Sequence, residues 1–172
     1  MKIRNDFVTN SSSSSFILAF DKSASTIRNS VTKAVNKFTD FDDPKDYYKY
    51  VPELIGMILS NLVTRIDVEK LPEIIEDEYR YNAYYEVESE YERTHRHEDH
   101  VYMKAWEFRR SKAGEAEVEK LIEQKIKEVK SKITDRDVVY LVNFGDDDPL
   151  SGEIEHHILP NCDFTVAMFN HH

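Results

Sequence analysis

A continuous apolar run at residues 16–20, Phe-Ile-Leu-Ala-Phe, limits more than any other feature what this chain can fold into. No polar residue interrupts it, as is typical of a strand that is buried on both faces. Asp21, Lys22 and Ser23 follow directly and end the strand. We therefore expect the core to be built around a short, fully buried strand near the N-terminus.

Amphipathic helical patterns separate this strand from two later ones. Apolar residues recur at helical spacing in residues 27–38, where Ser25 is a candidate N-cap, in residues 47–62, and in residues 118–133. Asp67 is a candidate cap for a third helix that carries Leu71, Ile74 and Ile75. Residues 138–144 and 164–169 are rich in β-branched and aromatic side chains, which is typical of strands. This order predicts an α/β fold, a small, mostly parallel sheet of about three strands covered by several helices.

The middle of the chain, residues 79–110, is rich in tyrosine and glutamate, and its periodicity is ambiguous. Residues 101–106 fit both a period of 2 and a period of 3.6, and we expect a helix. With 172 residues, the chain is long enough for one ordinary domain and too short for two. We expect a single domain, 1–172, whose core comprises residues 1–38 and 114–172, with a helical insertion at 39–113.

The composition argues against several classes of function. The net charge is −10 and the isoelectric point is about 5.2. A surface of this sign repels the phosphate backbone, so nucleic acid is not an expected partner. Only four glycines are present, which excludes the glycine-rich loops that bind dinucleotides or nucleoside triphosphates.

The single cysteine, Cys162, excludes a disulfide within the chain and fits a reducing cytoplasm. A lone cysteine is more often a small core residue than a nucleophile. The longest apolar run, residues 16–20, is far shorter than a membrane span, and the N-terminus lacks the pattern of a secretory signal. We expect a cytoplasmic protein that does not insert into a membrane.

Acidic residues concentrate in residues 67–100, which contain 12 Asp or Glu against 4 Lys or Arg, a net charge of −8. Solvated helix faces have such a composition, and so does an acidic surface that docks on a basic partner and speeds their association. The tyrosines of this region and Trp106 are open to the same two interpretations. They either pack half-buried, or they anchor an interface with a partner protein or a second copy of the chain.

The first residues carry a specific string. Arg4, residues 6–10 (Asp-Phe-Val-Thr-Asn), five serines and Phe16-Ile17 follow one another. The string resembles the N-terminal signature of a group of uncharacterised bacterial and phage proteins, Arg-x-Asp-Phe-Val-Thr-Asn, a serine run and then a hydrophobic strand. The resemblance covers about a tenth of the chain. It implies a shared N-terminal element in a bacterial, phage or mobile-element setting, and it implies no reaction.

Five serines in front of a buried strand are unusual, because serine has a modest β-propensity and competes for backbone hydrogen bonds. As a loop, their amides and hydroxyls can cradle an anion. Alternatively they form a polar lead-in, or an edge segment whose small side chains let another backbone come close. The candidate ligand-binding residues are Asn10, Ser11, Ser12, Ser13, Ser14 and Ser15.

Carboxylates follow two of the expected strands. Asp21 ends the first strand, and Asp146, Asp147 and Asp148 follow residues 138–144. In a parallel sheet these residues meet at the carboxyl edge, where they would suit Mg²⁺. His157 and His171 would add ligands suited to Zn²⁺, Mn²⁺ or Fe²⁺. The alternatives are an acidic surface turn and, for His171-His172, the remnant of a purification tag.

A weaker metal candidate is formed by His95, His97, Asp99 and His100. Their spacing matches the His-x-His-x-Asp-His string of metallo-β-lactamase-type hydrolases, in which these residues bind zinc. The likeness ends there, since a hydrophobic strand precedes the motif in that family, whereas Tyr, Glu and Arg precede it here. The match is either a coincidence in a His- and Glu-rich stretch or an adventitious metal site.

Two functional hypotheses follow. The leading one is an acidic protein-interaction module of bacterial or phage origin that binds a host protein or a second copy of itself. Its support is the charge and the lack of a complete catalytic set. The alternative is a metal- or nucleotide-binding domain that uses the serine run and the Asp/His cluster. Such a domain would carry a divalent metal and catalyse phosphoryl transfer or hydrolysis.

Overall fold

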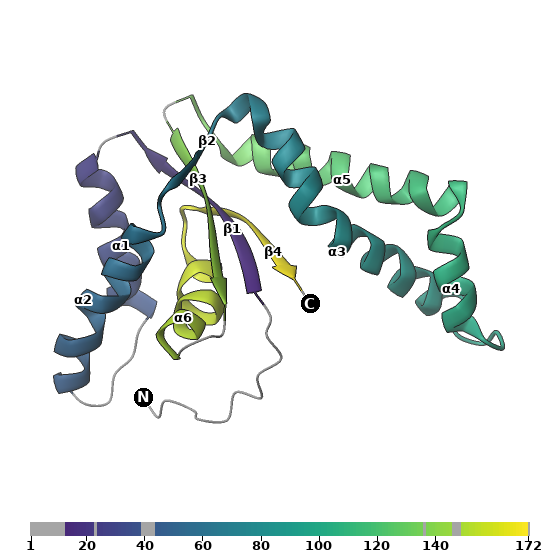
Figure 1. Cartoon of the computed structure of the whole chain (residues 1–172), viewed down its shortest axis with the longest axis horizontal. Coiled ribbons are helices and arrows are strands. Elements are labelled where there is room, and N and C mark those ends of the chain that lie inside the picture. The colour runs from purple at the N-terminus through teal and green to yellow at the C-terminus, as the bar shows by residue number, and fades with distance from the viewer. Residues whose placement is uncertain (1–12, 23, 39–43, 136, 146–148, 172) are drawn as a thin grey trace. The chain divides into compact units, whose positions relative to one another are not determined.

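The computed structural model describes residues 13–22, 24–38, 44–135, 137–145 and 149–171. The chain divides into two compact units, each with its own set of elements (Figure 1). The α/β unit comprises Met1–Val68 and Ile133–His172, and the helical unit comprises Glu69–Lys132. The sequence predicted a single domain with a helical insertion at 39–113. Whether the two units fold as one domain is not tested by their division, so this stays a prediction.

The α/β unit contains a four-stranded sheet in which every neighbouring pair of strands is antiparallel. Its strands are β1 (Ser13–Asp21), β2 (Thr64–Ile66), β3 (Asp137–Gly145) and β4 (Thr165–His171), arranged in the order β2-β3-β1-β4. The expected sheet, mostly parallel and with about three strands, is therefore wrong.

The physical reason lies in how two helical connections interleave. The connection from β1 to β2 runs through α1 (Ala24–Phe38) and α2 (Pro44–Ser60), and it passes over β3. The connection from β3 to β4 runs through α6 (Pro149–Glu153) and two short helical turns, η2 (Ile154–Ile158) and η3 (Leu159–Asn161), and it passes over β1. Each connection joins two parallel strands that are not neighbours, so antiparallel strands lie side by side. This is the split β-α-β-β-α-β topology.

The main hydrophobic core lies between the sheet and these helices. Phe16, Leu18 and Phe20 of β1 alternate onto one face of the strand and pack with buried residues of α1, α2 and η2. On the opposite face of the same strand, Ile17 is fully buried as well. The expectation that residues 16–20 form a strand buried on both faces is confirmed, with Ala19 half-buried.

The helical unit is formed by η1 (Val68–Lys70) followed by α3 (Leu71–Thr94), α4 (Val101–Arg109) and α5 (Lys112–Lys132). Every fourth residue of α3 is buried along one stripe: Leu71, Ile75, Tyr79, Ala83 and Val87. This spacing places them on one face of the helix, and α5 contributes a matching stripe that includes Val118, Ile122 and Val129. Residues 79–110, whose periodicity was ambiguous, form most of α3, the turn at 95–100 and the whole of α4, so the helix expected at 101–106 is confirmed.

Gly114 determines how closely α5 follows α4. A Cβ atom at this position would overlap the carbonyl oxygen of Phe108 and would lie 2.7 Å from the Cα atom of Arg109. Only glycine fits against that backbone without a shift of α4. The residue thus sets the joint between the two helices that line the groove described below.

Among the described residues, no helix is long and apolar enough to cross a membrane.

Candidate functional site

Part of the serine run lies inside the sheet. Ser14 and Ser15 belong to β1, the strand flanked by β3 and β4, and both are buried. The Ser14 hydroxyl donates to Oδ1 of Asn170 at 3.0 Å, and the Ser15 hydroxyl donates to Oδ1 of Asn143 at 2.6 Å. In each pair the two residues are direct cross-strand neighbours. Two of the predicted ligand-binding serines therefore hold neighbouring strands together.

The rest of the run lies at or beyond the end of the sheet. Ser13 is exposed at the start of β1, and its backbone pairs with Gly145 on one side and His171 on the other. The remaining candidates of this set, Asn10, Ser11 and Ser12, lie outside the described residues.

Two of the metal candidates, Asp21 and His171, lie at opposite ends of the sheet. Asp21 pairs with Asp137 at the end of β1 that is opposite to Ser13 and Gly145. At about 3.3 Å per residue, the two ends of this strand are roughly 26 Å apart. Asp146, Asp147 and Asp148 follow Gly145 but lie outside the described residues. The expected meeting of Asp21 with this segment depended on a parallel sheet, whereas in the antiparallel register Asp21 and Gly145 lie at opposite ends of the β1–β3 pair. His157 is exposed on η2.

The four residues of the His-x-His-x-Asp-His string lie between α3 and α4. His95 ends α3, where its ring stacks on Tyr91 with centroids 4.1 Å apart. His97, Asp99 and His100 are exposed, and His100 has a φ of 58° at the N-cap of α4. Among the residues that the structure describes, no three His, Cys, Asp or Glu side chains gather into a group suited to a metal ion. The string instead forms the turn between two helices.

Cys162 is a core residue. It is buried, and its thiol donates to the carbonyl oxygen of Ile158 at 3.0 Å. Burial raises the pKa of the thiol to about 12, so the thiol is protonated at neutral pH. Because the thiolate is the nucleophilic form, Cys162 is not suited to nucleophilic catalysis.

The helical unit contains a groove of about 770 Å³ lined by residues of α3, α4 and α5. Its apolar lining comes from Val87 and Tyr91 of α3, Phe108 of α4 and Leu121 of α5. The Tyr91 and Phe108 rings stack with centroids 4.9 Å apart. A groove of this volume has room for several side chains of a bound segment or for a drug-sized ligand.

The groove exists because α5 covers only part of α3, and the C-terminal part of α3 extends beyond it. The Tyr84 hydroxyl donates to Glu115 in the first turn of α5, so α3 continues for about three turns beyond the start of α5. Along this stretch α4 contacts α3 through an ion pair of 3.1 Å between Arg109 and Glu88. Glu86 lies on the other side of α3 by helical spacing, where it lines the groove.

Carboxylates surround the apolar lining. Glu86, Glu90 and Glu117 line the groove, and Arg93 is the one Lys or Arg among the lining residues that the structure gives for it. Hydrogen bonds from Arg93 lower the pKa of Glu90, so this carboxylate stays ionised at neutral pH. The Tyr79 hydroxyl donates to Glu86 at 2.7 Å. The groove thus combines an apolar lining with a mainly negative border.

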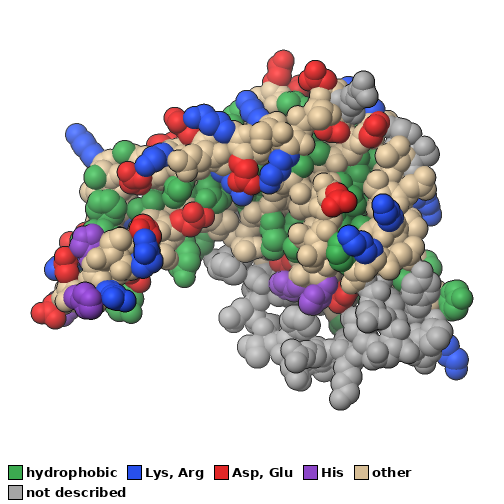
Figure 2. All heavy atoms as spheres, turned by 180° about the vertical axis from the view of Figure 1, so that it is seen from behind, with side chains coloured by type: hydrophobic (Ala, Val, Ile, Leu, Met, Phe, Trp, Pro, Cys, Tyr) green, Lys and Arg blue, Asp and Glu red, His purple; other side chains and the backbone are tan. Residues whose placement is uncertain are grey.

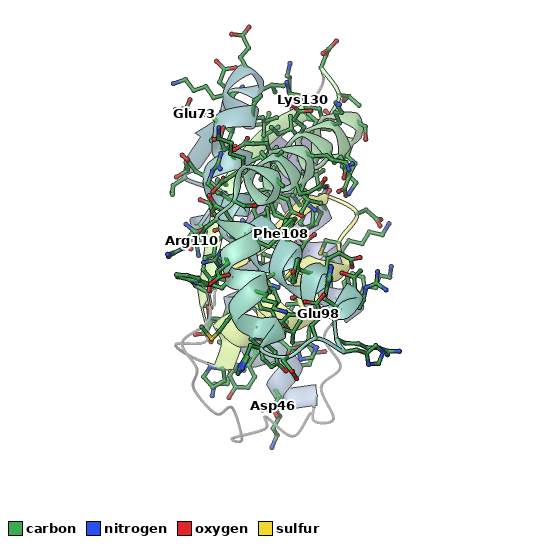
Figure 3. The ribbon with its side chains drawn as sticks, turned by 90° about the vertical axis from the view of Figure 1, so that its right-hand side faces the viewer. Asp46, Glu73, Glu98, Phe108, Arg110 and Lys130 are labelled. Carbon is green, nitrogen blue, oxygen red and sulfur yellow. The ribbon has the colours of Figure 1, made fainter. Side chains whose placement is uncertain are left out.

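Large apolar side chains are also exposed elsewhere on the helical unit, and Figure 2 shows hydrophobic side chains at its surface among charged ones. Tyr81 and Tyr85 of α3 are 56% and 65% exposed, and Tyr102, Met103 and Trp106 of α4 are 73%, 65% and 45% exposed. The Arg110 guanidinium lies over the Trp106 ring, 3.7 Å from its centroid. None of these five exposed side chains is among the lining residues given for the groove, so the two are separate surfaces. Figure 3 labels Phe108 of the groove and Arg110, the residue that follows α4.

The sequence pointed to one of these two surfaces. The tyrosines and Trp106 were candidate interface anchors by residue type alone. The groove was missed, because its lining comes from three helices and no sequence spacing connects Val87, Phe108 and Leu121. The amphipathic pattern of α5 contains Leu121 but does not indicate that α3 leaves it half-exposed.

Comparisons with protein-family models, with curated proteins and with solved structures find no match to this chain.

Proposed function

We propose that this chain is an acidic protein-interaction module of bacterial or phage origin, and that its helical unit contacts the partner protein. The observation that carries the proposal is the exposure, between 45% and 73%, of five large apolar side chains on α3 and α4. Tyrosine, tryptophan and methionine are enriched in interfaces, because they bury a large area while ordering few rotatable bonds. Their concentration on one small unit favours recognition of a protein surface.

The charge of the same region supports a basic partner. Residues 67–100 carry a net charge of −8, and Glu78 and Glu86 stand on either side of the exposed tyrosines of α3 in the sequence. Such a field raises the rate of association with a positively charged protein and is screened by salt. Bacterial or phage origin rests on the N-terminal signature, and a cytoplasmic location rests on the single cysteine.

The test is affinity capture from a bacterial lysate with the full chain and two variants. The variant Tyr102→Ser with Trp106→Ser removes two exposed aromatics of α4, while Tyr48→Ser removes one that is 78% exposed on α2, in the other unit. We expect a specific protein to be captured by the wild type and by Tyr48→Ser, with a loss of at least about tenfold for the α4 variant. Equal capture by all three proteins, or by none, would contradict the proposal.

A second copy of the chain is the simplest alternative partner. Light scattering of the purified protein gives the mass in solution, and a dimer that the α4 variant dissociates would assign the exposed aromatics to self-association. A dimer unaffected by the variant would place self-association on another surface.

The second candidate function is a metal- or nucleotide-binding domain with phosphoryl-transfer or hydrolytic activity. Its support is that Ser13, the first described serine of the run, lies beside Gly145 and His171 at one end of the sheet, and that residues 146–148 follow Gly145 directly in the sequence. Two of the serine hydroxyls bond to asparagines within the sheet, which leaves fewer groups for a ligand. Titration of untagged protein with Mg²⁺, Mn²⁺ and Zn²⁺, with and without ATP, tests it. Absence of binding in all six titrations would count against this candidate.

A further inference from the structure

We propose that the groove among α3, α4 and α5 binds a short amphipathic segment of a partner protein. Its apolar side chains would pack on Tyr91, Phe108 and Leu121, and its Lys or Arg residues would face the surrounding carboxylates. This inference rests on the proposed function and adds to it the place and the chemistry of one contact. The groove is a different surface from the exposed aromatic face of α4.

The apolar lining is ordered before a partner arrives. Tyr91 is held between two rings, His95 at 4.1 Å and Phe108 at 4.9 Å, and its carbonyl oxygen lies 3.0 Å from Nδ1 of His95. Val87, one helical turn before Tyr91 on α3, is buried. Because these side chains are already fixed, little conformational entropy is lost when another apolar side chain packs against them.

The charges at the border select the sign of the partner. Three carboxylates and one guanidinium line the groove, and the guanidinium of Arg93 already bonds to Glu90 at 2.6 Å and 2.8 Å. Glu117 receives a 3.3 Å hydrogen bond from Lys120, whose side chain is mostly exposed. A basic segment would add cations to a border with an excess of anions, whereas an acidic segment would be repelled.

The chain itself offers no free segment of this kind among its described residues. One basic stretch lies near the end of α5, with Lys125, Lys127, Lys130 and Lys132. Val129 in the middle of this stretch is fully buried within the helical unit. A second copy would have to unfold the end of α5 to fill the groove, which favours a different protein as the occupant.

The probe is a fluorescent synthetic peptide of about four helical turns with leucines on one face and lysines on the other. Its control has the same composition in scrambled order, so that the charge is kept and the apolar face is lost. Binding to the full chain is measured by anisotropy at about 50 mM and about 300 mM salt. We expect the amphipathic peptide to bind at least about tenfold more tightly than the scrambled one, with weaker binding at the higher salt concentration.

Matched variants locate the binding. Glu117→Lys reverses a charge at the groove, and Glu123→Lys makes the same change on an exposed position of α5 outside the lining. Each variant changes the net charge of the chain from −10 to about −8, so the long-range attraction of the basic peptide falls by the same amount in both. We expect Glu117→Lys to weaken binding about tenfold, and Glu123→Lys to weaken it by less than about threefold. Leu121→Asn, which keeps the charge, should also weaken binding about tenfold.

The outcomes separate this inference from the proposed function. Equal effects of Glu117→Lys and Glu123→Lys, or equal binding of both peptides, would overturn the groove proposal and leave capture through Trp106 untouched. If the wild type and the α4 variant capture the same proteins from the lysate while the amphipathic peptide still binds the groove, the proposed function is overturned instead. An apolar dye that binds the groove equally well in wild type and Glu117→Lys, while the peptide does not bind, would identify the groove as a small-ligand site and also overturn the inference. Circular dichroism of each variant confirms that its helices are retained.

Discussion

The two units use polar and apolar side chains in opposite ways. The α/β unit places the hydroxyls of Ser14 and Ser15 in the interior of a sheet, where each is matched by an asparagine. The helical unit leaves Tyr102 and Trp106 at its surface. The comparison teaches that the most unusual string of this sequence acts at least in part within the fold, while an unremarkable Tyr/Glu-rich stretch provides the surfaces suited to recognition.

The serine–asparagine pairs also define the register of the sheet. A slip of one residue between β1 and β3 would move Ser15 away from Asn143 and place its hydroxyl opposite an apolar neighbour. An unmatched buried hydroxyl costs free energy, so the pairs disfavour the wrong register. Tyr81 and Tyr85 of α3 differ from these serines in that their side chains are mostly exposed.

The largest expected effect is on the core of the α/β unit. Phe16 is fully buried and its ring makes an edge contact with Phe144, so Phe16→Ala should lower the free energy of unfolding by about 3–5 kcal/mol. Trp106→Ala, at a residue that is 45% exposed, should lower it by less than about 1 kcal/mol. Urea denaturation followed by circular dichroism measures both. A similar loss for both variants would make Trp106 a structural residue and would break the comparison.

The next effect tests whether the helical unit also has a position that tolerates no change. Gly114→Ala forces a methyl group against the Phe108 and Arg109 backbone and should cost about 2–3 kcal/mol. Gly56 lies inside α2, and no atom is within 4 Å of a Cβ atom built there. Gly56→Ala should therefore stabilise the protein by about 0.5–1 kcal/mol. Thermal unfolding distinguishes the two, and a neutral Gly114→Ala would mean that α4 shifts freely on α5.

A smaller effect is expected for the pair formed by Ser15 and Asn143. A double-mutant cycle with Ser15→Ala and Asn143→Ala should give a coupling free energy of about 1 kcal/mol, because the 2.6 Å hydrogen bond is lost in each single variant. Ser13→Ala, at the exposed start of the same strand, should change stability by less than about 0.5 kcal/mol. A coupling of zero would show that the hydroxyl of Ser15 contributes nothing through Asn143.

The smallest expected effect is a dependence of the free energy of unfolding on pH that arises from the buried carboxyl group of Glu153. Burial raises the pKa of Glu153 in α6 above its ordinary value, since the charged form is poorly solvated there. The favourable contribution of the protonated form is fully present below the ordinary glutamate pKa of about 4.3 and is lost as the pH rises through the raised value. Glu153→Gln should therefore gain stability relative to wild type between pH 4 and pH 7.

The exposed Glu123 of α5 provides the matching control in the helical unit. Glu123→Gln should show the same difference from wild type at both ends of that pH range, as measured by urea denaturation. A parallel gain in both glutamine variants would attribute the pH dependence to the net charge of −10 and not to the burial of Glu153.

The elements of the fold followed from local patterns, but their arrangement did not. The run at residues 16–20 predicted a buried strand, and the 3.6-residue spacing predicted α1, α2 and α5. Neither pattern contains information on which strands are neighbours, and the three-residue strand β2 is too short to show a pattern. The interleaved connections, and with them the antiparallel register, come from long-range packing.

The site was predictable to a similar degree. Residue type was enough to name Trp106 and the tyrosines as candidate anchors. The partners of the serines lie 128 and 156 residues away in the chain, so no local reading connects Ser15 with Asn143 or Ser14 with Asn170. The groove needs α3 to extend beyond the start of α5, which lies beside Tyr84, and it needs α5 to approach the backbone of α4 closely at Gly114.

The place of the helical unit in the chain has a consequence for how this protein can change over time. β2 and β3 are neighbours, with Ile66 opposite Val139, and the whole of Glu69–Lys132 connects them. The unit therefore occupies the position of a hairpin loop, and its two ends are attached to adjacent strands. Insertions and replacements are tolerated best at such positions, because the order of the strands is kept. The helical unit, with its exposed aromatic side chains, can thus be lengthened, exchanged or lost while the order of the strands stays the same.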